Sequence, residues 1–171
     1  MWLVRFISSS IGKKFLMACT GLLLLLFLTT HAIGNAAILF SSKAFQTYAD
    51  ALHSLPVVVF VFGIGLLAVV LIHIITGVLL FLQNLKNKTS RYEVSARVVK
   101  NTYASTTMPY SGIFILLFII IHVFGFGFSP SELKVSVLVK ELLSNFYYGV
   151  FYLFSFCALA LHLSHGFWSM L

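Results

Sequence analysis

Apolar residues gather in four long runs that contain no Lys, Arg, Asp or Glu. The runs cover residues 15–42, 51–85, 101–131 and 142–171. A helix needs about 20 apolar residues, at about 1.5 Å rise each, to cross the hydrocarbon core of a bilayer. We therefore expect transmembrane helices at about 15–40, 55–83, 109–129 and 144–169. The pattern predicts an all-α integral membrane protein, an up-down bundle of four transmembrane helices that forms a single domain over residues 1–171.

Composition agrees with a membrane protein. The chain is 60% hydrophobic and 9% charged, with a mean hydropathy of +1.04, whereas soluble domains carry about 25% charged residues. The two cysteines, Cys19 and Cys157, lie inside the apolar runs. They are too few for a disulfide framework or a thiolate metal cage, so we expect buried thiols.

The positive charge is concentrated in two of the connecting segments. Residues 1–14 carry three cations and no acid, and residues 86–100 carry five cations and one acid, while the other two connections are neutral. Cationic short loops stay in the cytoplasm. We expect a multi-pass protein of the bacterial inner (cytoplasmic) membrane with a cytoplasmic N-terminus. Because the cations flank membrane spans, we assign them to topology and lipid headgroups and expect no nucleic-acid partner.

The first apolar run resembles a signal peptide only in its basic start. It continues from Phe15 to about Phe40, longer than the 7–15 residues typical of a signal h-region, so we expect a retained span. A short amphipathic helix is expected at 132–141 on the outer surface. With few polar residues inside the spans, a transporter with a midplane substrate site is disfavoured.

All six histidines fall in the charge-free runs. Without a carboxylate nearby, a histidine in hydrocarbon is neutral, and a neutral imidazole offers one nitrogen lone pair to a metal. The alternative is a histidine that only bridges to a neighbouring helix.

Four of the histidines have a glycine three or four residues later on the same helix face. They are His31 with Gly34, His73 with Gly77, His122 with Gly125, and His162 with Gly166. A glycine one turn away removes the side chain that would collide with a flat macrocycle, which suits haem better than a bare ion.

The depth at which each of these histidines is expected in the bilayer groups them in two pairs. At about 1.5 Å per residue from the inner end of each span, His31 and His122 lie at an outer level, and His73 and His162 lie at an inner level. We therefore predict two six-coordinate haems, one on His31 and His122 and one on His73 and His162. His165, three residues after His162, is the rival for the fourth ligand.

Several motifs together resemble the dihaem cytochrome b subunit of succinate:quinone oxidoreductases. They are SSSIGKK at 8–14, TG at 20–21, HAIGN at 31–35, AF at 44–45 with a later LHSLP at 52–56, HIITG at 73–77, SG at 111–112 with a later His122, and HLSHGFWS at 162–169. The resemblance covers nearly the whole chain. It implies two haems b with the same ligand pairing, a distal haem on His31 and His122 and a proximal haem on His73 and His162, and it assigns the fourth ligand to His162.

The resemblance also implies partners and a reaction. The chain would carry electrons between a quinone, menaquinone being expected, and an iron-sulfur subunit, behind which a flavoprotein subunit interconverts succinate and fumarate. No catalytic residue for the dicarboxylate chemistry is then expected on this chain. At the outer end of the second span, Asp50 and His53 are the candidates for proton exchange with the quinone, and a turn or cap role is their alternative.

The chain departs from the family at two points. Family members usually have a fifth spanning helix, so the chain is expected to be a fragment, a shortened form or half of a split gene. Some relatives carry a carboxylate where this chain has Ala160. Two other functions stay open: a dihaem cytochrome b of another membrane dehydrogenase, and a haem-free helical scaffold.

Overall fold

The computed structural model describes residues 2–88, 103–127 and 134–170, and all the regular structure in these ranges is helical. Its helices are α1 (Trp2–Ser8), α2 (Ser10–Phe40), α3 (Ser42–His53), α4 (Pro56–Lys88), α5 (Tyr103–Gly127), α6 (Val135–Ser144) and α7 (Phe146–Met170). The all-α fold predicted from the sequence is confirmed.

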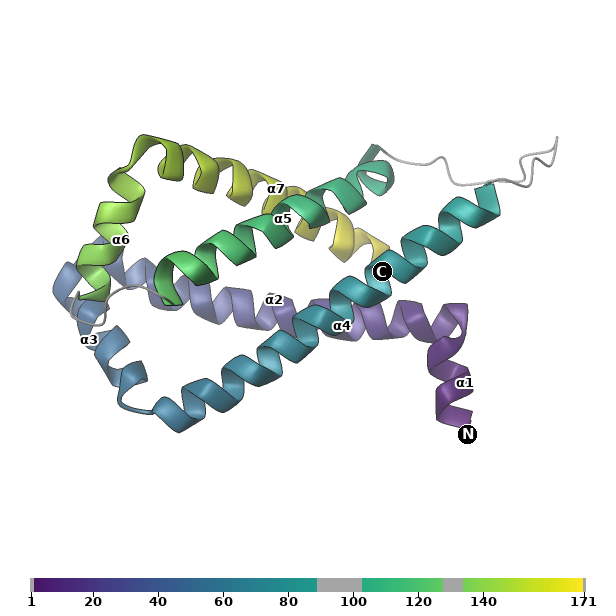
Figure 1. Ribbon diagram of the computed structural model, residues 1–171, viewed down its shortest axis with the longest axis horizontal. Helices are drawn as coiled ribbons and strands as arrows, with labels where there is room; N and C mark the ends of the chain where they lie inside the picture. Colours follow the sequence, from purple (N-terminus) through teal and green to yellow (C-terminus); the bar gives the residue numbers. More distant parts are fainter. Residues whose placement is uncertain (1, 89–102, 128–133, 171) are drawn as a thin grey trace.

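Four of these helices are long and apolar enough to cross a membrane. The candidate spans are Ser10–Phe40, Pro56–Lys86, Thr107–Gly127 and Phe146–Trp168. They alternate in direction along the bundle (Figure 1). The protein is a multi-pass membrane bundle, as the charge-free runs predicted.

Two helix starts differ from the expected bounds. The N-terminus of α2 lies at Ser10 because Ser9 caps it, its hydroxyl oxygen accepting from the amide of Gly12 at 3.0 Å. α5 begins at Tyr103 and contains Pro109, which was expected to open the third span. Pro109 is the seventh residue of α5, past the first turn, where a proline removes one hydrogen bond of the helix. Positions 128–129 of the expected third span lie outside the described residues.

The short helices lie between the spans or before them. α6 occupies Val135–Ser144, close to the amphipathic helix expected at 132–141, of which 132–133 lie outside the described residues. α1 and α3 were not predicted. α3 starts after Ser41, whose hydroxyl accepts from the amides of Lys43 and Ala44.

The spans pack as two hairpins (Figure 1). In the first hairpin α2 packs against α4, with α3 as the connection, and in the second α5 packs against α7, with α6 as the connection. Between the hairpins, α3 contacts α6 and α4 touches α5. We call the end that holds α3 and α6 the α3–α6 end and the opposite one the α1 end.

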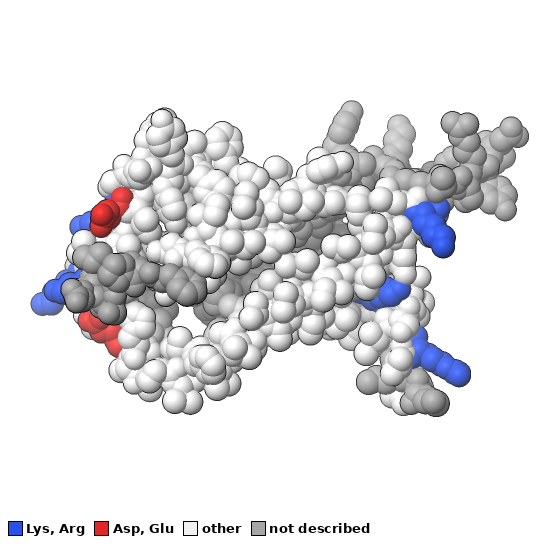
Figure 2. Space-filling view, in the orientation of Figure 1, with Lys and Arg blue, Asp and Glu red and all other residues white. Residues whose placement is uncertain are grey.

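Charge distinguishes the two ends. The described acidic residues, Asp50 and Glu141, both belong to the α3–α6 end, where lysines accompany them (Figure 2). The described charged residues of the α1 end are all cations, namely Arg5, Lys13, Lys14 and Lys86. No Asp, Glu, Lys or Arg lies between these two ends in the described parts of the four spans.

Candidate functional site

Each predicted histidine pair takes one member from each hairpin. His31 of α2 and His122 of α5 have ring centroids 5.8 Å apart, with the ring planes at 81°. His73 lies on α4 and His162 on α7. All four are partly buried. The fold therefore brings His31 and His122 together, and the pairing of His73 with His162 stays a prediction.

The spacing of the first pair fits a shared iron. Metal–imidazole bonds are about 2 Å long, so an iron between two imidazoles puts the ring centroids about 6 Å apart. The separation of His31 and His122 is close to this value. The centroid distance is therefore compatible with one iron shared by the two rings.

His73 is held from the neighbouring helix of its own hairpin. The Thr20 hydroxyl oxygen on α2 lies 3.0 Å from Nδ1 of His73, and Thr20 is buried. The residue after it, Gly21, lets the imidazole lie against α2, since a Cβ there would stand 3.5 Å from Cε1 of His73. Thr20 and Gly21 together thus position the imidazole ring against α2.

His162 has the same arrangement in the second hairpin. The Ser111 hydroxyl oxygen on α5 lies 3.0 Å from Nδ1 of His162, and a Cβ at Gly112 would stand 3.5 Å from Cε1. His165, the rival ligand, is partly buried one turn further along α7.

The two hydroxyls are placed to select the imidazole tautomers. The Leu16 carbonyl lies 2.8 Å from the Thr20 hydroxyl and the Met108 carbonyl lies 3.0 Å from the Ser111 hydroxyl, so each hydroxyl has an acceptor for its own hydrogen. With that hydrogen on the carbonyl, the hydroxyl oxygen accepts from Nδ1–H of its histidine, and Nε2 of His73 and His162 keeps a lone pair, the form in which imidazole binds a metal.

His122 is held by a tyrosine instead. Its Nδ1 lies 2.9 Å from the hydroxyl of Tyr152, whose oxygen is 3.4 Å from the hydroxyl of Tyr148. A phenol can accept from Nδ1–H while donating its own hydrogen onward. Tyr152 is one of the few buried large side chains among the described residues.

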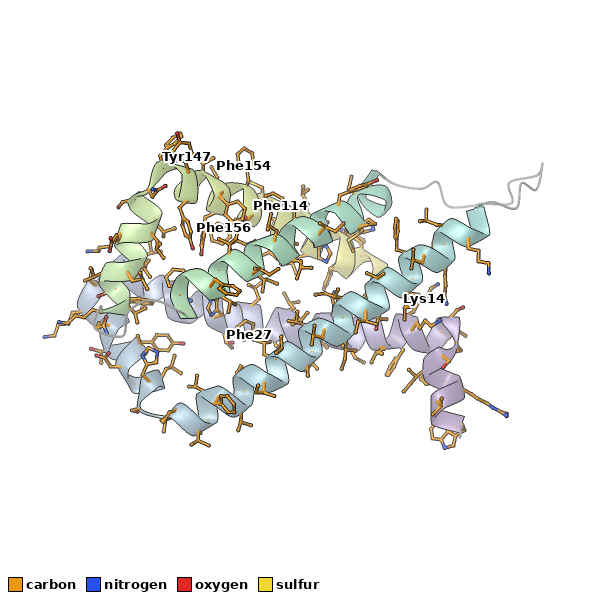
Figure 3. The ribbon with its side chains drawn as sticks, viewed as in Figure 1. Lys14, Phe27, Phe114, Tyr147, Phe154 and Phe156 are labelled. Carbon is orange, nitrogen blue, oxygen red and sulfur yellow. The ribbon has the colours of Figure 1, made fainter. Side chains whose placement is uncertain are left out.

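Aromatic rings surround the outer pair. Phe27 stacks on His31 with ring centroids 5.3 Å apart, and Phe118 and Phe126 lie 5.5 Å and 5.1 Å from His122. Phe27 projects from α2 toward α4 (Figure 3), where it contacts the ring of Phe62. Such walls are apolar and exclude water, which suits a macrocycle.

The four predicted glycines each face a side chain from another helix. A Cβ at Gly34 would meet the Tyr48 ring and one at Gly125 the Tyr148 hydroxyl, while Gly77 and Gly166 face the Cε atoms of Met17 and Met108. Tyrosine and methionine side chains thus lie over these glycines. The role of the glycines in admitting a macrocycle stays a prediction.

The two hairpins share an internal repeat that the sequence analysis missed. In α2 and α5 the same residues, or similar ones, recur at identical separations: Met17, Thr20, Gly21, Phe27, His31 and Gly34 correspond to Met108, Ser111, Gly112, Phe118, His122 and Gly125. In α4 and α7, Phe62, His73 and Gly77 correspond in the same way to Phe151, His162 and Gly166. Aligning the halves on their histidines would have revealed Thr20 and Ser111 as functional candidates.

The predicted quinone residues lie on α3. Asp50 and His53 are both exposed. Asp50 accepts a hydrogen bond of 2.7 Å from the Gln46 amide, and the Gln46 oxygen accepts from the backbone amide of Ser136 at 3.1 Å. Asp50 therefore orients a side chain that caps the N-terminus of α6. A contact of either residue with a quinone stays a prediction.

Metal binding at this site would need a cofactor that brings its own ligands. Among the described residues, no group of three or more His, Cys, Asp or Glu could hold a metal ion. Haem needs only two protein ligands, because the macrocycle supplies four nitrogens. No protein family model, curated protein or solved structure matches the chain.

Proposed function

We propose that the chain is the membrane-anchor and electron-carrying subunit of a succinate:quinone oxidoreductase, with two haems b between its hairpins. One haem is assigned to His31 and His122, and the other to His73 and His162. Haem iron held by two imidazoles has no open coordination position and passes single electrons. The succinate–fumarate reaction then belongs to a partner flavoprotein, reached through an iron-sulfur subunit.

The observation that carries the haem assignment is the matching hydroxyl partner of the two inner histidines. A hydroxyl oxygen from the neighbouring helix lies 3.0 Å from Nδ1 of both His73 and His162 and can accept from Nδ1–H. Metal-ligating histidines characteristically donate their second ring nitrogen in this way. Because Ser111 repeats for His162 what Thr20 does for His73, the fourth ligand is His162 in preference to His165.

The proposed orientation in the membrane and the proposed partner subunits are supported by the charge distribution and by the family resemblance. The α1 end, whose described charged residues are all cationic, would face the cytoplasm of a bacterium under the positive-inside rule. The iron-sulfur subunit would dock there, next to the proximal haem. A quinone would exchange electrons and protons at the α3–α6 end, where Asp50 and His53 are the residues predicted from the sequence.

Absorption spectroscopy of the purified complex tests this proposal, because bound haem gives the protein a visible colour. The chain is expressed with a haem supply and candidate partner subunits, and the purified complex is examined by absorption spectroscopy. We expect a low-spin b-type spectrum and two haems per chain. A colourless protein under these conditions would refute the assignment.

A haem-free helical scaffold is the second candidate. The observation that favours it is the same pair of hydroxyl–imidazole bonds, since they also bridge α2 to α4 and α5 to α7. Such bridges contribute about 1 kcal/mol each in membranes. A scaffold would show no visible absorption and only mild effects of each His→Ala substitution. If pigment is found with partners other than a flavoprotein and an iron-sulfur protein, the chain serves another dehydrogenase.

A further inference from the structure

A cavity lies between α5, α6 and α7 at the α3–α6 end. Its volume is about 460 Å³, and Ile121 and Phe151 give it apolar walls. Glu141, Asn145, Tyr147 and Tyr148 add polar groups to the lining. Sites for small organic ligands typically have about 300–1,000 Å³, mostly apolar walls and a few polar groups.

Exposed aromatic residues place this cavity at the edge of the hydrocarbon layer. Phe146 and Tyr147 begin α7, with 76% and 82% of their surfaces exposed. Tyr147 points away from the bundle at the corner between α6 and α7 (Figure 3). Aromatic side chains at the end of a span mark the membrane–water boundary. A lipid-soluble ligand with a polar ring can therefore reach the cavity from the bilayer.

Two hydroxyls connect the cavity wall to a predicted haem ligand. Tyr148 lines the cavity, and its hydroxyl lies 3.4 Å from that of Tyr152. The Tyr152 hydroxyl in turn lies 2.9 Å from Nδ1 of His122. A ligand that hydrogen-bonds Tyr148 is thus two hydroxyl groups from the imidazole.

The internal repeat indicates that this connection is not needed for packing a hairpin. When α4 and α7 are aligned on His73 and His162, the positions of Tyr148 and Tyr152 correspond to Val59 and Gly63 in the first hairpin. Tyr48 lies over Gly34 in the first hairpin as Tyr148 lies over Gly125 in the second, so a tyrosine at that place is common to both halves. The Tyr152 hydroxyl, which joins Tyr148 to His122, has no counterpart at Gly63 and is specific to the half that holds the cavity.

We propose that this cavity binds the headgroup of the quinone, with Tyr148 hydrogen-bonded to one quinone oxygen. This inference rests on the proposed function and names its quinone site. A quinone carbonyl accepts a hydrogen bond and a quinol hydroxyl donates one, and a tyrosine hydroxyl can serve both forms. The exposed Glu141 carboxylate accepts from the hydroxyl of the quinol and connects the site with the aqueous side.

The proposal differs from the site predicted around Asp50 and His53. Those residues lie on α3 of the first hairpin, and the Asp50 carboxylate already holds Gln46. The cavity belongs to the second hairpin, on α5, α6 and α7. The two locations fall on different peptides, so a covalent label separates them.

The test is photolabelling of the purified complex with an azido-naphthoquinone that bears one isoprene unit. Labelled peptides are identified by mass spectrometry, and the haem spectrum of the same sample is recorded. We expect the label between residues 134 and 152. A label between residues 42 and 67, or no label on a chain that holds both haems, would overturn the site. A label at 134–152 on a haem-free chain would support the site while refuting the proposed function.

Three substitutions refine this experiment. Tyr148→Phe is expected to reduce labelling about tenfold, the loss of one good hydrogen bond. Glu141→Gln should leave labelling by the oxidised probe unchanged, because Glu141 is assigned to the quinol hydroxyl, and should weaken about tenfold the protection from labelling that added quinol gives. Tyr110→Phe is the matched control, because Tyr110 is a 72% exposed tyrosine on α5 outside the cavity. If Tyr148→Phe fails to fold, quinol protection in the exposed Glu141 variant decides. Unchanged labelling of folded Tyr148→Phe, or unchanged quinol protection in Glu141→Gln, would overturn the role of that residue.

Discussion

The hydroxyl of Thr20 lies 3.0 Å from Nδ1 of His73 and donates its own hydrogen to the Leu16 carbonyl. This geometry orients the imidazole from within the hairpin and favours the tautomer with its proton on Nδ1. A ligand oriented in advance loses less conformational freedom when it binds a metal.

Replacing Thr20 by valine tests this orientation. Valine keeps the shape and removes the acceptor, and the loss of such an outer partner typically costs about tenfold or more in metal affinity. We expect the variant to retain one haem firmly and to lose the other in dilute detergent, as measured by the haem-to-protein ratio.

Thr29→Val is the control for Thr20→Val. Thr29 makes the same intrahelical bond, to the Leu25 carbonyl at 2.8 Å, but lies exposed on α2. It should retain both haems. Equal haem loss from the two variants would attribute the effect to α2 itself.

The ligand pairs make a second prediction. His73→Ala and His162→Ala should each remove one haem, and the double variant should remove no more, because both residues are assigned to one iron. Residual haem is measured by redox titration of the absorption spectrum. His165→Ala should keep two haems. If that variant alone lost a haem, the fourth ligand would be misassigned.

The spans could be predicted from the sequence because hydropathy reflects the free energy of moving side chains from water into the apolar bilayer. Each charge-free run became a spanning helix. α3 was missed because its polar face outweighs its apolar one, although Phe45 and Ala49, four residues apart, are buried on one side. Helix formation there depends on tertiary contacts and on the Ser41 cap, which a search for long apolar runs does not detect.

The histidines were predictable and their partners were not. His31, His73, His122 and His162 stand out as polar residues in apolar runs. Thr20 resembles any small polar residue in a span until α2 and α4 are known to be neighbours. Tyr152 could not be singled out for the same reason, because it lies far from His122 in the sequence. Aromatic residues are also common in all four spans, so one more tyrosine does not stand out.

Tyr152→Phe makes a third prediction. A hydrogen bond from Nδ1–H makes an imidazole a stronger donor to iron and favours the ferric state. Without the hydroxyl, the midpoint potential of the His31–His122 haem should rise by about 40 mV, equivalent to about 1 kcal/mol. The other haem should not change. The potentials of both haems are measured by redox titration, and Tyr110→Phe, on a 72% exposed side chain outside the cavity, is the control. A lowered potential would mean that Tyr152 donates to Nδ1.

The hairpins themselves make the last prediction, because each haem would join one histidine from either side. α3 contacts α6, and few side chains of these two helices are buried, namely Phe45, Ala49, Ser136 and Leu138. We expect a chain cut at a protease site inserted after residue 94 to stay together in detergent when made with haem. The halves should separate when the protein is made without haem, as measured by size-exclusion chromatography.

A cut at Leu55, between α3 and α4, is the control for the cut after residue 94. α2 and α4 pack directly along the first hairpin, so those fragments should stay together with or without haem. Halves cut after residue 94 that remain associated without haem would show that side-chain packing joins the hairpins. In that case each histidine pair would bridge surfaces already held in place, and removing its haem would leave the bundle intact.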